Sequence, residues 1–166
     1  PQAMEINLPP EEEQDTQVEV KESNLLTVRV DAEGRYWWNV KRATPENLPQ
    51  LLPTAPGTPD TVGYRFNADS LRGLLVEQNR TNPKLSTLVL IHRDASYADM
   101  VNILDEIDVI ERSWNYAIAE RLDKKVSELT KEDGKFSYRY AMAPWEDRDN
   151  KVLEAAIAAA QAAGLL

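Results

Sequence analysis

Four acidic side chains lie close together in one stretch of the chain and are candidates for general acid and base chemistry. They are Asp105, Glu106, Asp108 and Glu111. Paired carboxylates can divide the roles of acid and base when their surroundings separate their pKa values. The apolar residues around them repeat with helical spacing, which places these carboxylates on the polar side of a helix. We therefore interpret them as a solvated helix face.

His92 is the only histidine, and the chain has no cysteine. A metal site needs several ligands at set spacings, and no second ligand accompanies His92 at such a spacing. The sequence also has no glycine-rich phosphate loop and no G-x-S-x-G nucleophile motif. We therefore predict that the chain has no enzymatic activity and binds neither a metal nor another cofactor.

The net charge also limits the class of partner. The 166 residues carry 19 Lys and Arg against 28 Asp and Glu, which gives a net charge of -9. This sign repels a phosphate backbone, and no basic stripe offsets it, so nucleic-acid binding is excluded. The sequence contains no apolar run of about 18 residues, which is the length needed to span a bilayer. The chain begins at Pro1 without a signal-like segment, and we expect it to be a fragment of a longer protein.

The first residues predict a tether that leads into a strand. Residues 1–24 hold seven acidic residues and one lysine, and Pro9 and Pro10 forbid a regular helix there. We expect residues 1–16 to form a mobile tether. Val18 and Val20 then alternate with polar residues, which predicts a short edge strand.

A β-hairpin is the next element. Apolar residues alternate over 26–30 and 36–40, on either side of an Asp-Ala-Glu-Gly turn at 31–34. Trp37 and Trp38 must point to opposite faces of one strand. We assign Trp38 to the core, so Trp37 is the candidate for an exposed interaction surface. Five prolines between residues 44 and 63 predict a long loop or insertion.

The rest of the chain alternates between helix and strand. Helical spacing starts after Asn67 or Asp69, either of which can cap a helix that runs to Gln78. Residues 88–91 form a buried strand, and Ser96 with Asp99 has capping-box spacing before a long amphipathic helix that reaches Val126. Alternation over 136–142 predicts the last strand, and an alanine-rich helix follows over 151–163.

This order of elements predicts an α+β fold. We expect a mixed sheet of four to five short strands with two helices layered on one face, and a C-terminal helical extension. The predicted divisions are the tether at 1–16, one domain at 17–142 that contains a proline-rich insertion at 45–63, and the extension at 143–166.

Three segments carry a resemblance to a known family. They are MEINLPP, the hairpin LLTVRVDAEGRYWWNV, and VLIHRDASYADMVNILDEID. Their order resembles the periplasmic part of the ExbD/TolR family of biopolymer-transport proteins over residues 4–110. In that family a Leu-Pro element follows a membrane helix, and a strand runs into Asp, then Tyr, then a helix rich in Val and Met. Leu8-Pro9 matches the first feature, and Asp94, Tyr97, Met100 and Val101 match the second.

The resemblance implies a non-enzymatic domain of an energy-transduction complex driven by the proton-motive force. Family members are homodimers that are anchored in the inner membrane by one helix and assemble with an ExbB/TolQ-type channel. Their periplasmic domains couple to TonB-like or TolA-like partners in outer-membrane transport or envelope maintenance, and some bind peptidoglycan. The alternative function is therefore a peptidoglycan-binding anchor. The proton-carrying aspartate of the family lies in the membrane helix, outside this sequence, so no catalytic residue carries over.

We expect partner binding at three places, each with a structural alternative. Leu8 and Pro9 dock on the channel rim or form a rigid exit from the membrane helix. Asp94 and Tyr97 contact a partner, or Asp94 is a cap or turn residue. The strand of Val18 and Val20 offers unpaired backbone groups to a second copy or to a partner strand. Family spacing would put the last strand near 115–119 rather than at 136–142, and helix-forming residues there favour the later position.

Overall fold

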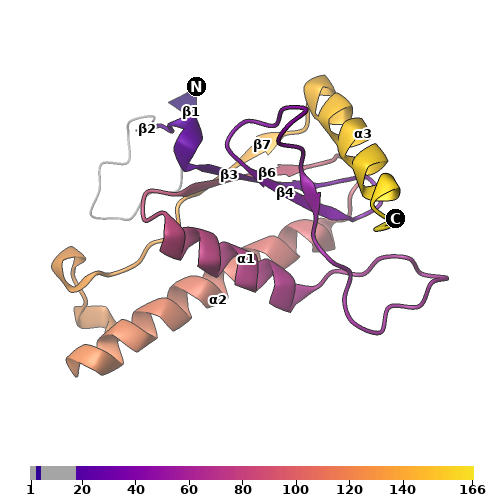
Figure 1. The fold of residues 1–166 in the computed structure, drawn as a ribbon. Helices are drawn as coiled ribbons and strands as arrows, with labels where there is room; N and C mark the ends of the chain where they lie inside the picture. The colour runs from indigo at the N-terminus through magenta and orange to yellow at the C-terminus, as the bar shows by residue number, and fades with distance from the viewer. Residues whose placement is uncertain (1–2, 5–17) are drawn as a thin grey trace.

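The computed structural model describes residues 3–4 and 18–166, with side chains from Val20 onward. The predicted tether, including Leu8 and Pro9, therefore lies almost entirely outside the described residues. Figure 1 shows a central sheet with the two helices α1 (Ala68–Thr81) and α2 (Tyr97–Leu122) below it and α3 (Asp147–Ala162) above it. The α+β class predicted from the sequence is confirmed.

The central sheet has five strands in the order β5-β4-β3-β6-β7. β3 (Leu25–Val30) and β4 (Tyr36–Val40) form the predicted hairpin, and β5 (Gln50–Leu51) extends it antiparallel. β6 (Ser86–Ile91) and β7 (Tyr140–Pro144) are parallel to β3. The two parallel connections run through α1 and α2, and a helical crossover is what such connections require. The predicted mixed sheet of four to five strands is confirmed.

The main core lies between the sheet and the helices α1 and α2. Alternate residues of the strands point into it, and Val28, Val30 and Val89 have almost no exposed surface. Leu71 and Leu75 of α1 and Ile103 and Ile107 of α2 close it from below. The side chain of Asn67 caps α1 by accepting from the Ser70 N–H at 3.0 Å. This packing fixes α1 and α2 against the sheet.

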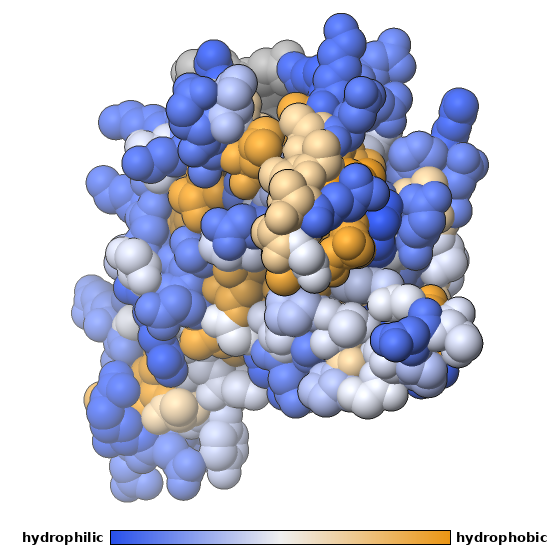
Figure 2. Space-filling view, turned by 45° about the vertical axis from the view of Figure 1, so that its right-hand side comes forward, coloured by the Kyte–Doolittle hydropathy of each residue, from blue (hydrophilic) through white to orange (hydrophobic). Residues whose placement is uncertain are grey.

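The opposite face of the sheet is covered by α3. Trp37 is fully buried there against Ala156 and Ala160, so the sequence-based assignment of Trp37 to an exposed surface is wrong. Arg29 also points to this face and pairs with Asp149 of α3 at 3.0 Å. Figure 2 shows α3 in the pale orange of its alanines, with strongly apolar surface on both sides of it. Small side chains let α3 lie close to the sheet.

The predicted edge strand of Val18 and Val20 lies outside the central sheet. β2 (Val18–Glu19) pairs antiparallel with β1 (Ala3–Met4) in a separate two-stranded sheet. Val20 follows β2 and is buried beside Leu25, Leu88 and Ala141. A short 3-10 turn at Glu22–Asn24 then leads into β3. In the described part of the chain, β5 and β7 are the edges of the central sheet.

The last strand, β7, starts later than predicted because side chains of α2 accept hydrogen bonds from the backbone N–H groups just before it. The N–H of Phe136 donates to Asn115 Oδ1 at 2.7 Å, and the N–H of Tyr138 donates to Glu111 at 2.8 Å. These residues of α2 hold 136–138 outside the ladder, which begins where Thr87 donates to the Arg139 carbonyl. A strand at 115–119 is excluded because α2 runs through it. The 3-10 turns at Val126–Glu128 and Lys131–Asp133 carry the chain back toward the sheet.

The proline-rich segment forms an irregular loop that is closed at its base. The N–H of Ala55 donates to the Arg65 carbonyl, and Thr54 Oγ1 accepts from the Arg65 N–H at 2.9 Å. Tyr64 donates from its hydroxyl to the Leu52 carbonyl at 2.8 Å. Between these contacts residues 56–63 project from the domain (Figure 1). Residues 56–63 are thus a loop, as predicted, but the predicted insertion at 45–63 also contains the strand β5, which pairs with β4.

Candidate partner-binding surface

Asp94 and Tyr97 lie on the turn that connects β6 to α2. Asp94 lies in the turn itself, and its side chain is 71 % exposed. Tyr97 is the first residue of α2 and is 76 % exposed. Ser96, not Asp94, caps the helix: it accepts from the Asp99 N–H, and Asp99 accepts in return from Ser96. Both predicted residues therefore present their side chains to solvent from one turn.

A hydrogen-bond network beneath this turn fixes the start of α2 against the hairpin. The hydroxyl of Tyr36 donates to Asp99, with oxygen-to-oxygen distances of 3.1 Å to the carbonyl and 3.2 Å to Oδ1. Asn102 donates to the same hydroxyl at 3.4 Å. Burial raises the pKa of Tyr36, so the phenol keeps its proton. Gly34 has φ +76°, a conformation that residues with a side chain rarely adopt, and a Cβ there would make ordinary contact with Asp99 Oδ2 at 3.5 Å.

The hairpin turn is built around Asp31, whose role the sequence did not reveal. Its carboxylate is fully buried and accepts from the N–H groups of Glu33 and Arg35, from Arg35 Nε at 2.7 Å and from Trp37 Nε1 at 2.9 Å. Every buried lone pair is thereby engaged. The only sequence signal was the turn motif Asp-Ala-Glu-Gly, which does not show that the aspartate is buried.

The buried pair of Arg29 and Asp149 was also missed. Arg29 Nε donates to Asp149 at 3.0 Å, and its Nη1 donates to Asn39 at the same distance. Burial lowers the pKa of Arg29, while the neighbouring carboxylate of Asp149 opposes that shift. Alternation within 26–30 placed Arg29 away from the core but could not show that a distant helix covers it. This pair belongs to packing rather than to an open site.

The four neighbouring carboxylates at positions 105, 106, 108 and 111 of α2 do not share one environment. Asp105 and Asp108 are exposed, and Asp108 pairs with Arg112 at 3.0 Å. Glu106 is buried and accepts from Arg72 at 2.7 Å, so the prediction that it lies on a solvated face is wrong. The ion pair with Arg72 of α1 offsets the free-energy cost of burying the Glu106 carboxylate. No acid and base pair is formed by these carboxylates.

His92 lies at the end of β6, where its ring meets Trp145 edge to face at 5.3 Å between centroids. Its Nδ1 accepts from the Asp94 N–H at 3.0 Å. Within residues 3–4 and 18–166, no three His, Cys, Asp or Glu side chains converge as metal ligands would. The histidine is thus part of the turn that presents Asp94.

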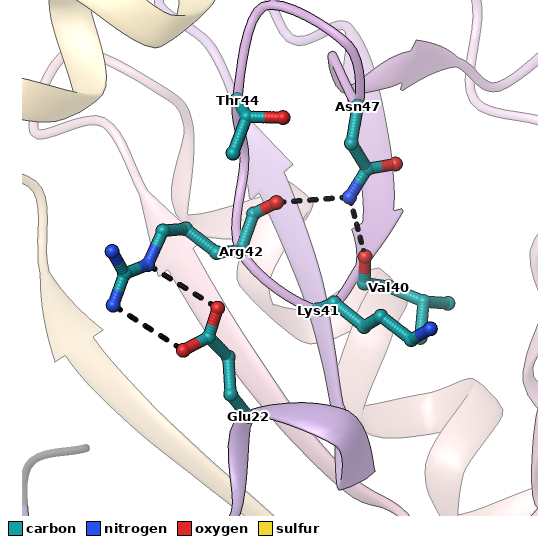
Figure 3. Close-up of a pocket in the computed structure, with 6 residues that line it drawn as sticks. All are labelled: Glu22, Val40, Lys41, Arg42, Thr44 and Asn47. Atoms are coloured by element: carbon teal, nitrogen blue, oxygen red, sulfur yellow. Dashed lines mark hydrogen bonds and ion pairs between the residues drawn. The ribbon is translucent and has the colours of Figure 1, made fainter.

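A shallow hollow lies at the other end of the sheet (Figure 3). Arg42 and Glu22 form a double ion pair on one wall, at 3.2 and 3.3 Å. Lys41 adopts the left-handed conformation at φ 68°, which is uncommon for a residue with a side chain. Asn47 holds that backbone in place by donating to the carbonyls of Val40 and Arg42. The hollow therefore has a fixed backbone and charges of both signs.

The remaining predicted site residues are only partly described. Val18 is paired in β2, and the burial of Val20 hides its side chain from a partner. Leu8 and Pro9 lie outside the described residues. No helix in the described part of the chain has an apolar stretch long enough to cross a membrane.

Comparison with known proteins places the chain in a family. The family model described as biopolymer transport protein ExbD/TolR matches residues 1–111, which include the hairpin, α1, β6 and the turn of Asp94 and Tyr97. Searches of curated proteins and of solved structures gave no match. The family match covers about two thirds of the sequence, in agreement with the resemblance of its motifs. The chain belongs to the ExbD/TolR family of biopolymer-transport proteins.

Proposed function

We propose that this chain is the periplasmic coupling domain of a transport complex driven by the proton-motive force. Membership of the ExbD/TolR family implies a role in biopolymer transport through energy transduction. In the proposal the domain is non-enzymatic, forms a homodimer and is held at the inner membrane beside an ExbB/TolQ-like channel, with Leu8 and Pro9 at the channel rim. It transmits motion to a TonB-like or TolA-like partner.

The observation that supports this proposal best is the turn of Asp94 and Tyr97. Tyr97 is 76 % exposed, so little of it packs within the domain, and exposed aromatics are common anchors of interfaces. The turn lies on fixed elements, because Ser96, Asp99 and Tyr36 hold the start of α2. A partner would meet a turn whose backbone is already held in place, which lowers the entropy lost on binding.

Alanine substitution at the turn tests this function. Tyr97→Ala should weaken binding of a TonB-like or TolA-like periplasmic segment by about tenfold or more, as expected for an interface aromatic. Tyr116→Ala is the matched control, since Tyr116 is 60 % exposed on the same helix but far from the turn. The binding constants can be measured by calorimetry. Equal affinity of Tyr97→Ala and the parent would rule out the turn as the contact.

A strand of the partner is the second proposed contact. Among the described residues, Val18 and Glu19 pair with β1 along one edge. Val18→Pro removes one backbone donor and should abolish binding of an extended partner peptide in an NMR titration. Leu90→Ala is the comparison, because Leu90 is buried and its loss should lower stability by about 2 to 5 kcal/mol without removing the strand edge. Undiminished binding by folded Val18→Pro would exclude strand addition at β2.

A peptidoglycan-binding anchor is the second candidate function, and the hollow beside Lys41 favours it. Lys41, Arg42 and Glu22 offer charges of both signs to peptide stems that carry carboxylates and amines. Lys41→Ala should then reduce co-sedimentation with purified cell-wall sacculi, whereas Lys84→Ala, at another exposed lysine, should not. The same sedimentation of both variants would remove the hollow from consideration.

A further inference from the structure

The turn between β6 and α2 contains a hydrogen bond that depends on the protonation of one ring nitrogen. Asp94 N–H donates to His92 Nδ1 at 3.0 Å. A ring nitrogen accepts only when it carries no proton, so the structure requires the neutral imidazole with its proton on Nε2. Imidazole is also the side chain that ordinarily changes charge between about pH 5 and 8.

The backbone on both sides of His92 is held by hydrogen bonds, so the side chain is the part of this residue that can respond to a change of pH. The N–H of His92 donates to the Val30 carbonyl at 2.9 Å, and its own carbonyl accepts from the Ala95 N–H at 2.9 Å. These bonds fix the main chain on both sides of the ring. The bond from Asp94 is thus the contact in the turn that protonation of Nδ1 removes.

The charged groups around His92 define what a protonated ring would meet. Asp94 Oδ2 lies 3.9 Å from Nδ1, and Arg93 is exposed on the same turn. The link from β7 to α3 places the uncharged indole of Trp145 against the ring.

Neighbouring charges on the packed elements already have partners. Asp31 at the end of β3 pairs with Arg35 at 2.7 Å, and Glu146 before α3 pairs with Arg148 at 2.9 Å. Among the described residues, the carboxylate of Asp94 is the charge that lies within ion-pair distance of the imidazole.

We propose that His92 is a proton-operated switch of the turn that carries Asp94 and Tyr97. When Nδ1 is neutral, it accepts from the Asp94 amide, and the Asp94 carboxylate lies 3.9 Å from it and stays 71 % exposed. When Nδ1 gains a proton, two N–H groups face one another and that hydrogen bond is lost. The new imidazolium then attracts the carboxylate of Asp94, which withdraws it from solvent. The turn consequently presents a different surface at low pH.

NMR of the full chain tests the switch without any partner. The single histidine makes its ring nitrogens unambiguous. At about pH 8 the ring should carry its proton on Nε2, and between about pH 8 and pH 5.5 the Asp94 amide signal should move with the same midpoint as the imidazole. A proton on Nδ1 at pH 8, or an Asp94 amide that does not follow the imidazole, would overturn the switch.

Two variants separate the switch from general effects of pH. His92→Asn places an amide oxygen where Nδ1 lies, so the Asp94 N–H keeps an acceptor. The asparagine side chain does not titrate. Its Asp94 amide should stay constant over this pH range. His92→Phe keeps a ring against Trp145 without an acceptor, and its Asp94 amide should exchange about tenfold faster at every pH. The same pH-dependent movement in His92→Asn would overturn the proposal.

The effect on partner binding rests on the proposed function and needs its own measurement. Binding of a TonB-like or TolA-like segment should weaken about tenfold from pH 8 to pH 5.5 in the parent and stay constant in His92→Asn. Equal pH dependence in both proteins would overturn the coupling to the partner. If Asp94→Ala and Tyr97→Ala bind like the parent while the NMR titration is as expected, the switch holds and the proposed contact is wrong.

Discussion

At the scale of single residues, the second face of the sheet depends on two buried carboxylates. Asp31 has no exposed surface and Asp149 has 2 %, and each is held by a cation and by other donors. A buried charge is stable only when it is paired and hydrogen-bonded. Removing one member therefore leaves the other charge in a place without water.

Substitution of Asp149 tests this dependence. Asp149→Ala leaves the Arg29 guanidinium buried, with a hydrogen bond to Asn39 but no carboxylate beside it, and should lower the free energy of unfolding by about 3 to 5 kcal/mol. Asp147→Ala is the matched control in the same helical turn, where an exposed acid contributes about 0.3 to 1 kcal/mol. Urea denaturation measures both. A loss below about 1 kcal/mol for Asp149→Ala would contradict the role of the pair.

Tyr138 makes stability fall at alkaline pH. Burial raises its pKa from 10.0 to about 12, while the hydrogen bond with Thr87 acts in the opposite direction. A phenol with a raised pKa contributes stability that is complete below pH 10 and is lost as the pH rises toward 12. Two pKa units correspond to about 2 to 3 kcal/mol.

The measurement is urea denaturation at several pH values between 9 and 12. The parent should lose stability over this range, and Tyr138→Phe should lose less because it has no proton to lose; the buried Tyr36 and Tyr64, whose pKa values are also raised, account for the rest of the decrease. Tyr116→Phe, at an exposed phenol, is the control and should follow the parent. A decrease in Tyr138→Phe as steep as in the parent would show that other groups cause it.

At the scale of elements, α3 determines which part of the sheet is open to solvent. Its small residues Ala156 and Ala160 lie against Trp37 and Leu51, and Asp149 anchors its first turn. The sequence-based division treats residues 143–166 as an extension separate from the domain at 17–142. We propose that the two unfold together, because α3 supplies the buried partner of Arg29.

A charge placed under α3 should release it. Ala156→Glu puts a carboxylate where the side chain is 1 % exposed against Trp37, and the cost of burying it should detach the helix. Tryptophan emission should then shift to longer wavelength as Trp37 meets water. Ala155→Glu, one residue away and exposed, should leave the emission unchanged. An unshifted spectrum of Ala156→Glu would argue against the tight contact.

Local patterns predicted those elements whose bonds are local. The hairpin, the helix cap and the Ser96 capping box are determined by neighbours in sequence. The hairpin and the capping box are confirmed, and of the two caps predicted, Asn67 or Asp69, the structure has Asn67. The start of β7 and the burial of Trp37 were predicted wrongly because side chains of distant helices decide them. Asn115 and Glu111 take the backbone groups of 136–138, and α3 covers Trp37. The spacing of apolar residues along the sequence does not reveal contacts made by distant helices.

The candidate site was likewise predicted only where neighbouring residues in the sequence determine it. The motif from Asp94 to Val101 predicted the place of the turn, and the exposure of Asp94 and Tyr97 agrees with a contact role that stays a prediction. The burial of Glu106 was missed because its partner Arg72 comes from another helix. The hydrogen bond to His92 depends on the geometry of the turn, which residue types alone do not give.

At the scale of the whole molecule, we expect the chain to form a dimer. β2 is a two-residue strand paired only with β1 among the described residues, and a second copy can satisfy its other edge. Sedimentation equilibrium at high micromolar concentration should give twice the mass of one chain, and Val18→Pro should shift it toward the monomer. A parent that sediments as a monomer would contradict dimerisation of this part of the protein.

The parallel arrangement of β3 and β6 has a mechanical consequence. The chain reaches β3 through Glu22–Asn24 at one end of the sheet, and the turn of Asp94 lies at the opposite end, directly after β6. Tension applied between these two points acts along the strands. The ladder bonds between β3 and β6 are then loaded in shear and must break together, whereas a pull across the strands would open them one at a time. A pull along this axis therefore meets more resistance than a pull across the strands.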